Sequence, residues 1–383
     1  MTKFRLMTPG PSPVPEDTLL ELAKPVHYHR TPEAKQYLHE VTLGMQYLLQ
    51  TKNDVVTLTS SGTGAMEAAL VNSVPSGGKA ICVFCGRFGE RWHKVWQAFG
   101  VNSIPVTAPW GQTVSADQLA SALAEHPDAQ AVCAVHSETS TGVKSDIQAY
   151  SKLVAQTKSV MIIDAISSAG AMECRTDDWQ IDMVATGSQK ALMLPPGLAF
   201  LSVSPKAWQK IDANVRPATF YFDLKKARSK LKDPDTSFTP AHTLIRALRL
   251  SLQRVKAEGI ENVWQRHSHM AFAARAGVEA LGLELFAKPP AEGLTTFNVP
   301  SNLDGKAILA KLEKQYGLKL AGGQDQLQGK IVRLAHMGYM DFFDVISALS
   351  GLELVLAEMG HRFDLGVGVA AAQKAYATWK PRQ

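Results

Sequence analysis

The feature that most restricts how this chain can fold is a regular alternation of short apolar runs with helical stretches between residues 55 and 203. Seven apolar runs have the length of buried strands: 55–59, 80–84, 103–107, 131–135, 160–164, 183–186 and 198–203. Helical patterns separate several of them, at 66–74, 91–99, 116–124 and 147–156. Apolar strands separated by helices predict an α/β fold with a mostly parallel seven-stranded sheet between helices. In such sheets, ligands bind beyond the carboxyl ends of the strands.

The pattern changes near residue 243, which predicts a second structural unit. Long helical stretches now alternate with isolated strands, as is typical of a smaller α+β domain. A chain of 383 residues is also longer than one hydrophobic core usually supports. At the N-terminus, four prolines between Thr8 and Pro15 exclude a helix and predict an extended arm. We therefore expect an arm at 1–15, a large domain at 16–257 and a small C-terminal domain at 258–383.

The charge and apolar content of the chain favour a small-molecule enzyme. The 40 basic and 35 acidic residues give a net charge of +5, and the densest basic run, 225–232, suits a solvated face. No apolar run approaches the ~18 residues of a membrane span, and the N-terminal residues lack the apolar core of a signal peptide. We expect a cytoplasmic protein without nucleic-acid or membrane partners. A modest positive field suits an anionic substrate.

The four cysteines suggest no redox or metal chemistry. Cys82 and Cys85 form a C-x-x-C pair, which elsewhere can belong to a redox motif or to half of a zinc site. Here no second C-x-x-C or H-x-x-x-H follows, and the pair lies in an apolar run. We expect core thiols in a reducing compartment, and no bound metal.

A phosphate-binding turn is the first candidate functional element. Residues 60–65, Ser-Ser-Gly-Thr-Gly-Ala, follow the first strand and begin an apolar helix. Small residues let backbone N–H groups approach a phosphate, and the helix N-terminus favours an anion. The hydroxyls of Ser61 and Thr63 would add donors. The motif matches neither a Walker loop nor G-x-G-x-x-G, and a plain helix N-cap explains it equally well when it is taken alone.

Two ionisable residues lie on the ligand side of later strands. Asp164 is the last residue of the 160–164 strand. A carboxylate buried there needs a cation, a metal or a protonated ring nitrogen as its partner. Alternatively, Asp164 could simply cap a helix. Lys190 follows a Gly-Ser-Gln turn, where desolvation lowers an amine's pKa as a Schiff-base lysine requires. A phosphate turn, an acid and a lysine in this order together indicate pyridoxal 5′-phosphate (PLP), which needs all three.

At these residues the chain resembles the class V aminotransferases of PLP fold type I, within the alanine/serine–glyoxylate (serine–pyruvate) branch. The resemblance covers nearly the whole chain. It is carried by Thr8-Pro-Gly-Pro-Ser, Ser61-Gly-Thr-Gly-Ala-Met-Glu-Ala-Ala-Leu, Gly86-Arg-Phe-Gly-Glu-Arg-Trp, Glu138-Thr-Ser-Thr-Gly, Asp164-Ala-Ile-Ser-Ser, Gly187-Ser-Gln-Lys-Ala, Pro195-Pro-Gly-Leu, Gly322-Gly and Val332-Arg-Leu.

The resemblance implies a role for each matching residue. Lys190 would hold the cofactor's aldehyde as a Schiff base, and Asp164 would pair with its ring nitrogen. The remaining cofactor contacts would come from Ser61, Gly62, Thr63 and Gln189 at the phosphate, Phe88 stacking on the ring, Ile166 beneath the ring and Thr139 near its O3′ oxygen.

Two further matches concern the substrate and the partner subunit. Arg333 matches the arginine that binds the substrate carboxylate, for which a bidentate guanidinium is the usual partner. Thr239 matches a threonine that reaches the neighbouring subunit's phosphate, which implies a homodimer with shared active sites. Some relatives have a tyrosine where this chain has Thr236, so a second contact of that kind is in doubt.

The implied function is a PLP-dependent transamination from alanine or serine to glyoxylate or pyruvate, by a ping-pong mechanism. Two alternatives remain open. The donor could instead be 2-aminoethylphosphonate, ureidoglycine or aspartate, or the chain could be a non-catalytic subunit of a larger complex. A cysteine desulfurase shares the fold but needs a nucleophilic cysteine late in the chain, and no cysteine follows Cys174.

Overall fold

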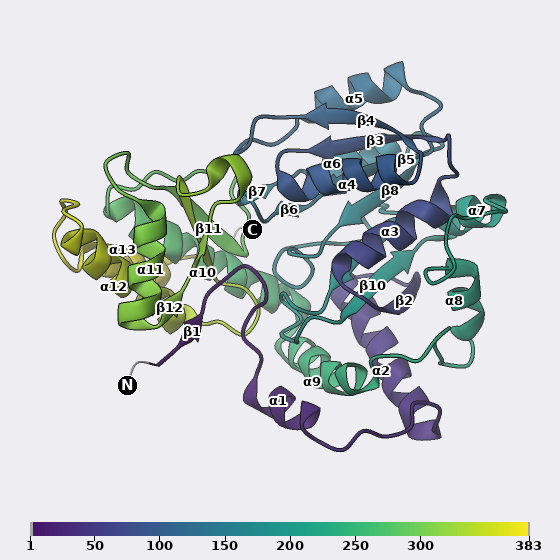
Figure 1. Cartoon of the computed structure of the whole chain (residues 1–383), viewed down its shortest axis with the longest axis horizontal. Helices are drawn as coiled ribbons and strands as arrows, with labels where there is room; N and C mark the ends of the chain where they lie inside the picture. The colour runs from purple at the N-terminus through teal and green to yellow at the C-terminus, as the bar shows by residue number, and fades with distance from the viewer. Residues whose placement is uncertain (1–2, 382–383) are drawn as a thin grey trace.

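A seven-stranded sheet forms the centre of the larger part of the molecule (Figure 1). The structure, a computed structural model, describes residues 3–381. The strand order is β2-β10-β9-β8-β5-β3-β4; the strands from β9 to β4 run parallel, and β10 is antiparallel to both of its neighbours. The predicted sheet is therefore confirmed. Its strands are β2 (Asp54–Thr59), β3 (Lys79–Phe84), β4 (Asn102–Thr107), β5 (Ala131–Val135), β8 (Val160–Asp164), β9 (Met183–Gly187) and β10 (Leu198–Val203).

Helices cover both faces of this sheet because successive side chains of a strand point to opposite sides. In β5, for example, Val132 and Ala134 join one hydrophobic core, whereas Ala131 and Cys133 join the other. The first core is closed by α2 (Pro32–Leu49), α5 (Ala116–Glu125), α6 (Ile147–Val154) and α9 (His242–Glu258). The second is closed by α3 (Gly62–Ser73), α4 (Arg87–Ala98) and α7 (Pro205–Ala213).

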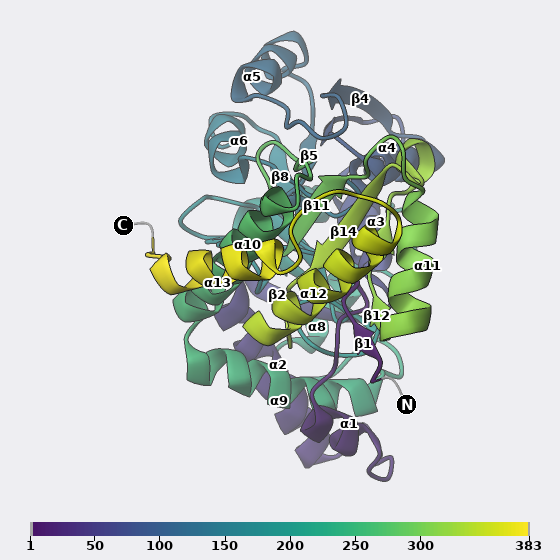
Figure 2. The same ribbon diagram turned by 90° about the vertical axis from the view of Figure 1, so that its left-hand side faces the viewer.

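A three-stranded antiparallel sheet with helices forms the smaller part of the molecule, which faces the viewer in Figure 2. Its strand order is β11 (Leu294–Asn298), β14 (Ile331–Ala335) and β13 (Ala321–Gly322). A separate hydrophobic core joins this sheet to α10 (Ile260–Ala280), α11 (Gly305–Tyr316), α12 (Phe342–Glu358) and α13 (Val367–Thr378). Helix α13 is absent from the predicted elements, because its alanine-rich sequence has no clear apolar periodicity.

The N-terminal arm touches both parts of the molecule. Strand β1 (Arg5–Leu6) pairs in parallel with β12 (Leu318–Lys319) of the smaller part, beside which Figure 1 draws it. A few residues later, Ser12 N donates to the carbonyl oxygen of Gln189 in the larger part at 3.1 Å. The arm stays non-helical until α1 (Glu16–Leu22) begins, as its prolines predict.

Helix packing changes at Gly259, between α9 and α10. Helix α9 packs against α1 and α2, whereas α10 packs against α12 and α13. Gly259 has a φ of 86°, in the left-handed region that glycine adopts without strain. This change of partners supports a division near residue 257, which stays a prediction.

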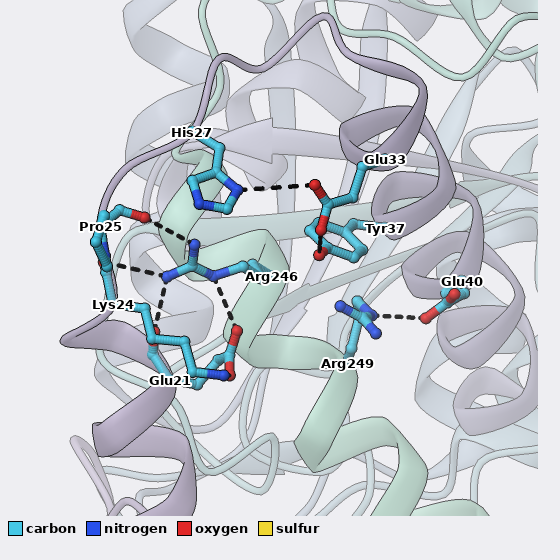
Figure 3. Close-up of polar contacts among 9 residues, drawn as sticks. All are labelled: Glu21, Lys24, Pro25, His27, Glu33, Tyr37, Glu40, Arg246 and Arg249. Atoms are coloured by element: carbon cyan, nitrogen blue, oxygen red, sulfur yellow. Dashed lines mark hydrogen bonds and ion pairs between the residues drawn. The ribbon is translucent and has the colours of Figure 1, made fainter.

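Arg246 of α9 anchors α1 and the chain that follows it (Figure 3). Its buried guanidinium lies 2.9 Å from Glu21 Oε1 and donates to the carbonyl oxygens of Glu21 and Pro25 at 2.8 and 3.0 Å. On the same helix, Arg249 pairs with Glu40 of α2 at 2.6 Å. The start of the chain is therefore held against the helices of the larger part.

All four cysteines are buried free thiols. Cys82 and Cys133 face each other on neighbouring strands, with their sulfur atoms 3.3 Å apart. Among residues 3–381, no group of three or more His, Cys, Asp or Glu side chains is arranged to hold a metal ion. In the same range, no helix combines the length and the apolar character needed to cross a bilayer.

Candidate active site

Asp164 and Lys190 lie at the same edge of the large sheet. Asp164 is the last residue of β8 and pairs in register with Ala185 of the parallel neighbour β9. Lys190 follows β9 after a short turn. Since neighbouring parallel strands end at one edge, both side chains belong to the edge where ligands bind. Both are buried, with 4% and 8% of their surface exposed.

The carboxylate of Asp164 is buried without a cationic partner. Its Oδ1 accepts a hydrogen bond from Ile166 N at 2.9 Å, and its Oδ2 accepts one from Trp92 Nε1 at 3.2 Å. It forms no salt bridge with any other described residue, although the charge of Lys190 acts on it from farther away. Burial raises the pKa of Asp164 to about 6, and the two donors oppose that rise. A buried acid held by two donors and left without a cation fits the protonated nitrogen of a pyridine ring.

Lys190 points its amine at the N-terminal arm. Lys190 Nζ donates to the carbonyl oxygen of Pro9, and Ser12 Oγ donates to the carbonyl oxygen of Lys190 at 2.6 Å. A Cβ atom at Gly10 would lie 2.5 Å from Lys190 Nζ, so only glycine leaves the lysine room. Burial lowers the pKa of Lys190 to about 8. An amine with this pKa is partly neutral near pH 7 and can react with an aldehyde.

The predicted phosphate turn lies beside the strand that leads to Lys190. Ser61 is the N-cap of α3, but its side chain makes no capping hydrogen bond. A Cβ atom at Gly62 would lie 2.4 Å from Ile166 Cδ1, so a side chain there would fill the site. A Cβ atom at Gly187 would lie 3.5 Å from Gly62 N, which places the turn next to the end of β9. Unbonded hydroxyl and N–H groups at a helix N-terminus fit an anion such as a phosphate.

Two further side chains border this turn. Arg91 Nη1 donates to Thr63 Oγ1 at 3.1 Å, which brings a guanidinium to the turn. Gln189 Oε1 is buried without a hydrogen-bond partner in the protein. A buried polar atom without a partner is costly unless a ligand or water satisfies it. The residues present therefore fit PLP at its phosphate end as well as at its ring nitrogen.

Phe88 and Thr139 lie on two segments that touch each other. Phe88 is half-buried in the first turn of α4, and the Arg91 guanidinium lies 4.9 Å from the centre of its ring. Thr139 is buried, and its Oγ1 lies 2.5 Å from Ser167 Oγ. The Glu138 carboxylate joins the two segments by accepting a hydrogen bond from Phe88 N at 3.1 Å.

Arg333 is a buried cation that has only carbonyl partners. Its Nη1 donates to the carbonyl oxygen of Thr139 at 2.8 Å, and its Nε donates to that of Gly322 at 2.9 Å. Arg333 forms no salt bridge with any described residue. Only 6% of its surface is exposed, so water does little to solvate the charge. Burial lowers the pKa of Arg333 to about 10, so the side chain stays charged at neutral pH. A desolvated guanidinium with donors to spare is suited to bind a carboxylate.

Thr239 is exposed and lies outside the group of buried side chains around Lys190. It lies before α9, along a cavity of about 80 Å³ that is also lined by Thr57 and Thr59 of β2. Thr236 is half-buried, and its Oγ1 donates to the carbonyl oxygen of Phe238 at 2.6 Å. A contact from either residue to a second subunit stays a prediction.

Sequence reasoning missed Trp92, Arg91 and Glu138 as neighbours of the site. All three belong to motifs that carry the family resemblance, but nothing in their local sequence indicates their partners. From the sequence alone, Trp92 would be interpreted as a core aromatic residue of α4. Its hydrogen bond to Asp164 joins residues 72 positions apart. Glu138 is likewise bonded to residues about 50 positions earlier. Such contacts follow only from the strand order.

Known proteins resemble this chain along nearly all of its length. The "Soluble hydrogenase, small subunit" of Synechococcus sp. is 42% identical to this chain. The match covers 98% of this chain and 99% of the relative. The L-aspartate–glyoxylate aminotransferase of Paracoccus denitrificans is 35% identical, with 97% and 96% of the two chains covered. The serine–glyoxylate aminotransferase of Arabidopsis thaliana is 31% identical, with 97% and 94% covered.

The fold agrees with these relationships. The crystal structure of ureidoglycine–glyoxylate aminotransferase from Bacillus subtilis superposes with a TM-score of 0.94 at 28% identity, covering 99% of both chains. The Aminotransferase class-V family model matches residues 20–341. Because the family model matches most of this chain, the chain belongs to the class V aminotransferases and is a PLP-dependent aminotransferase.

Proposed function

We propose that this enzyme transfers the amino group of a small L-amino acid, alanine or serine, to glyoxylate or pyruvate. Support for the acceptor comes from relatives and a structural neighbour whose names include glyoxylate, and support for a serine donor comes from the Arabidopsis relative. The two half-reactions share one site, so a keto acid leaves before the second keto acid enters. Ping-pong kinetics follow from that order.

The observation that carries this proposal is the grouping of a buried amine, a buried acid and a buried guanidinium. Lys190 interacts electrostatically with both Asp164 and Arg333. The lysine has a lowered pKa, and neither the acid nor the arginine forms a salt bridge with a described residue. The cofactor or an amino-acid substrate can supply a binding partner for each of these three groups.

We assign the remaining contacts by the same reasoning. The phosphate contacts are Ser61, Gly62, Thr63 and Gln189. The ring contacts are Phe88, Ile166, Thr139 and Asp164, with Lys190 as the covalent attachment.

PLP, when bound, supplies the electron sink that lets an amino acid lose its Cα proton. Lys190 Nζ is the base that removes this proton, since it is the buried amine with a pKa near neutrality. Arg333 binds the substrate carboxylate and thereby fixes where Cα lies. Ile166 and Phe88 exclude water from the ring.

We also propose a cytoplasmic homodimer in which Thr239 contacts the partner subunit's cofactor phosphate. The exposed aromatic residues Phe220 and Tyr221, with 80% and 45% of their surface exposed, support a covered face in this region. Mixing Lys190→Ala and Thr239→Ala subunits tests the shared site. Mixed dimers should recover part of the activity that each parent lacks, and unchanged activity after mixing would contradict shared sites.

Two alternatives have support among the relatives. An aspartate donor is supported by the Paracoccus enzyme, and a non-catalytic subunit by the Synechococcus relative. The retention of Lys190, Asp164 and Arg333 in one buried group favours a working enzyme over a non-catalytic subunit.

The deciding experiment is an absorbance titration of the purified protein with L-alanine, L-serine, L-aspartate and 2-aminoethylphosphonate. A band at about 400–430 nm, the region of lysine-bound PLP, should bleach with alanine or serine. Bleaching with aspartate or the phosphonate alone would keep the reaction and change the donor. A protein with no band after PLP is added would contradict the proposal.

A further inference from the structure

Glu138 is a fully buried carboxylate that accepts hydrogen bonds from Phe88, Gly89 and Ser140. Its Oε2 accepts from Phe88 N at 3.1 Å and from Gly89 N at 3.0 Å, and both groups belong to the first turn of α4. Its Oε1 accepts from Ser140 N at 3.0 Å and from Ser140 Oγ at 2.5 Å. The hydroxyl of Ser140 accepts a hydrogen bond from Arg87 N at 3.0 Å, which leaves its own hydrogen free to be donated to Glu138.

This set of donors favours an ionised carboxylate. Three of the four partners are backbone N–H groups, which can only donate, and a carboxylate accepts all four bonds. The N-terminus of α4 favours the negative charge further. Burial raises the pKa of Glu138, and the hydrogen bonds from Ser140, Gly89 and Phe88 oppose that rise.

Glu138 connects the two segments that border cofactor and substrate. On one side it holds the backbone of Phe88, whose ring is assigned to the cofactor. On the other side it fixes the 139–140 turn, and the carbonyl oxygen of Thr139 in that turn accepts the bond from Arg333. A shift of this carboxylate would therefore move both the ring and the support of the substrate arginine.

We propose that Glu138 is a positioning residue and the buried counter-charge of the active centre, which keeps Phe88 and Arg333 in register and balances Lys190 and Arg333. This inference rests on the roles proposed above for those three residues. Glu138 itself is not proposed to contact the cofactor or the substrate.

The charges around Glu138 make the inference measurable. Two anions, Glu138 and Asp164, share this buried region with the cations Lys190 and Arg333, and the charge of Glu138 favours the protonated forms of both cations. Arg87 and Arg91 lie on the first turns of α4 and add positive charge at its N-terminus. Removal of the Glu138 charge should therefore lower the pKa at which the lysine-linked cofactor loses its proton.

The test compares Glu138→Gln with Glu353→Gln in the PLP-loaded protein. Glu353 is a matched control, since it is also buried and accepts bonds from Gly366 N, Gly368 N and Val369 N at 2.6, 2.8 and 3.0 Å around the N-terminus of α13. Both variants should lower the melting temperature. Only Glu138→Gln should shift the pH midpoint of the cofactor absorbance, and the shift should be downward because a negative charge that favours the protonated lysine is removed.

Substrate binding provides a second readout. Glu138→Gln should raise the KM for the amino donor about tenfold through the displaced Arg333, and Glu353→Gln should leave it unchanged. Ser140→Ala keeps the charge but loosens the turn, so it should raise KM without moving the absorbance midpoint. This variant also keeps the inference testable if Glu138→Gln does not fold.

The outcomes separate this inference from the proposed function. An unchanged midpoint and KM in Glu138→Gln, with stability lowered as in Glu353→Gln, would overturn the role of Glu138 while leaving the proposed function intact. An unchanged KM in Ser140→Ala would overturn the positioning part. Retention of the lysine-linked band in Lys190→Ala would instead count against the proposed function.

Discussion

Trp92 Nε1 lies 3.2 Å from Asp164 Oδ2 and donates a hydrogen bond to it across the interface between α4 and the large sheet. Both side chains are buried, and the backbone N–H of Ile166 occupies the other carboxylate oxygen. The indole therefore fixes the orientation of the carboxylate and stabilises its ionised form, without adding a charge.

Replacement of Trp92 by phenylalanine should weaken cofactor binding. The change removes a hydrogen bond to a charged group, which contributes roughly 1.5 kcal/mol, so PLP affinity should fall about tenfold. Fluorescence or absorbance titration of the apo-protein with PLP measures this. Trp96→Phe is the matched control: Trp96 is also buried in α4, but its Nε1 donates to Cys133 Sγ at 3.1 Å. Equal affinity losses in the two variants would mean that the Asp164 bond is unimportant.

The contribution of Asp164 to the stability of the apo-protein should fall as the pH rises from about 4 to about 6. Burial raises the pKa of Asp164 from 3.8 to about 6, so in this window the folded state holds a proton that the unfolded state has released. The contribution of Asp164 is therefore greatest below the lower pKa and has fallen by about 3 kcal/mol above the higher one. Asp164→Asn removes this dependence. Urea unfolding of both apo-proteins across the window should show their difference changing with pH, and a constant difference would contradict the shift.

Lys190→Met should abolish turnover and stabilise the apo-protein at pH 7. Burial lowers the pKa of Lys190 from 10.5 to about 8, so the charged lysine destabilises the fold below pH 8 by about 3 kcal/mol. This penalty disappears as the pH rises from about 8 to 10.5, because the unfolded state then holds the extra proton. Lys152→Met, at an exposed position of α6, should change neither property. Intact steady-state transamination by Lys190→Met would contradict the assignment of the lysine.

The sequence was sufficient to predict the sheet and the residues of its ligand edge. Strands buried on both faces leave continuous apolar runs, and the end of such a run places Asp164 and Lys190 without knowledge of the strand order. The family resemblance then supplied roles for Phe88 and Arg333, because those positions carry no local signal of function.

What the sequence did not reveal depends on contacts between distant segments. The partners of Glu138 and Trp92 follow from β5, β8 and α4 lying side by side, an order that periodicity does not determine. Helix α13 was missed for a different reason, because alanine and glycine fit a helix face without marking it as apolar. The contact of Pro9 with Lys190 likewise required the path of the arm.

Arg333→Lys should impair substrate binding much more than cofactor binding. A lysine keeps the charge but cannot form a bidentate pair with a carboxylate while also reaching the carbonyl oxygens of Thr139 and Gly322. We expect the KM for the amino donor to rise about a hundredfold, from a loss of roughly 3 kcal/mol, with the cofactor band unchanged. Steady-state kinetics and the absorbance spectrum measure the two effects. A KM near that of the wild type would exclude Arg333 as the carboxylate ligand.

Arg246→Met should destabilise the fold far more than Arg249→Met, although both residues lie on α9 and pair with a glutamate (Figure 3). Loss of the buried Arg246 guanidinium leaves the carbonyl oxygens of Glu21, Lys24 and Pro25 without this donor and leaves the Glu21 carboxylate with Lys24 alone, at a cost of about 3 kcal/mol. The side chains of Arg249 and Glu40 are 21% and 34% exposed, so water replaces their contact and the loss should stay near 1 kcal/mol or below. Urea unfolding of the two variants measures the difference. Equal losses would mean that the N-terminal segment is not held by Arg246.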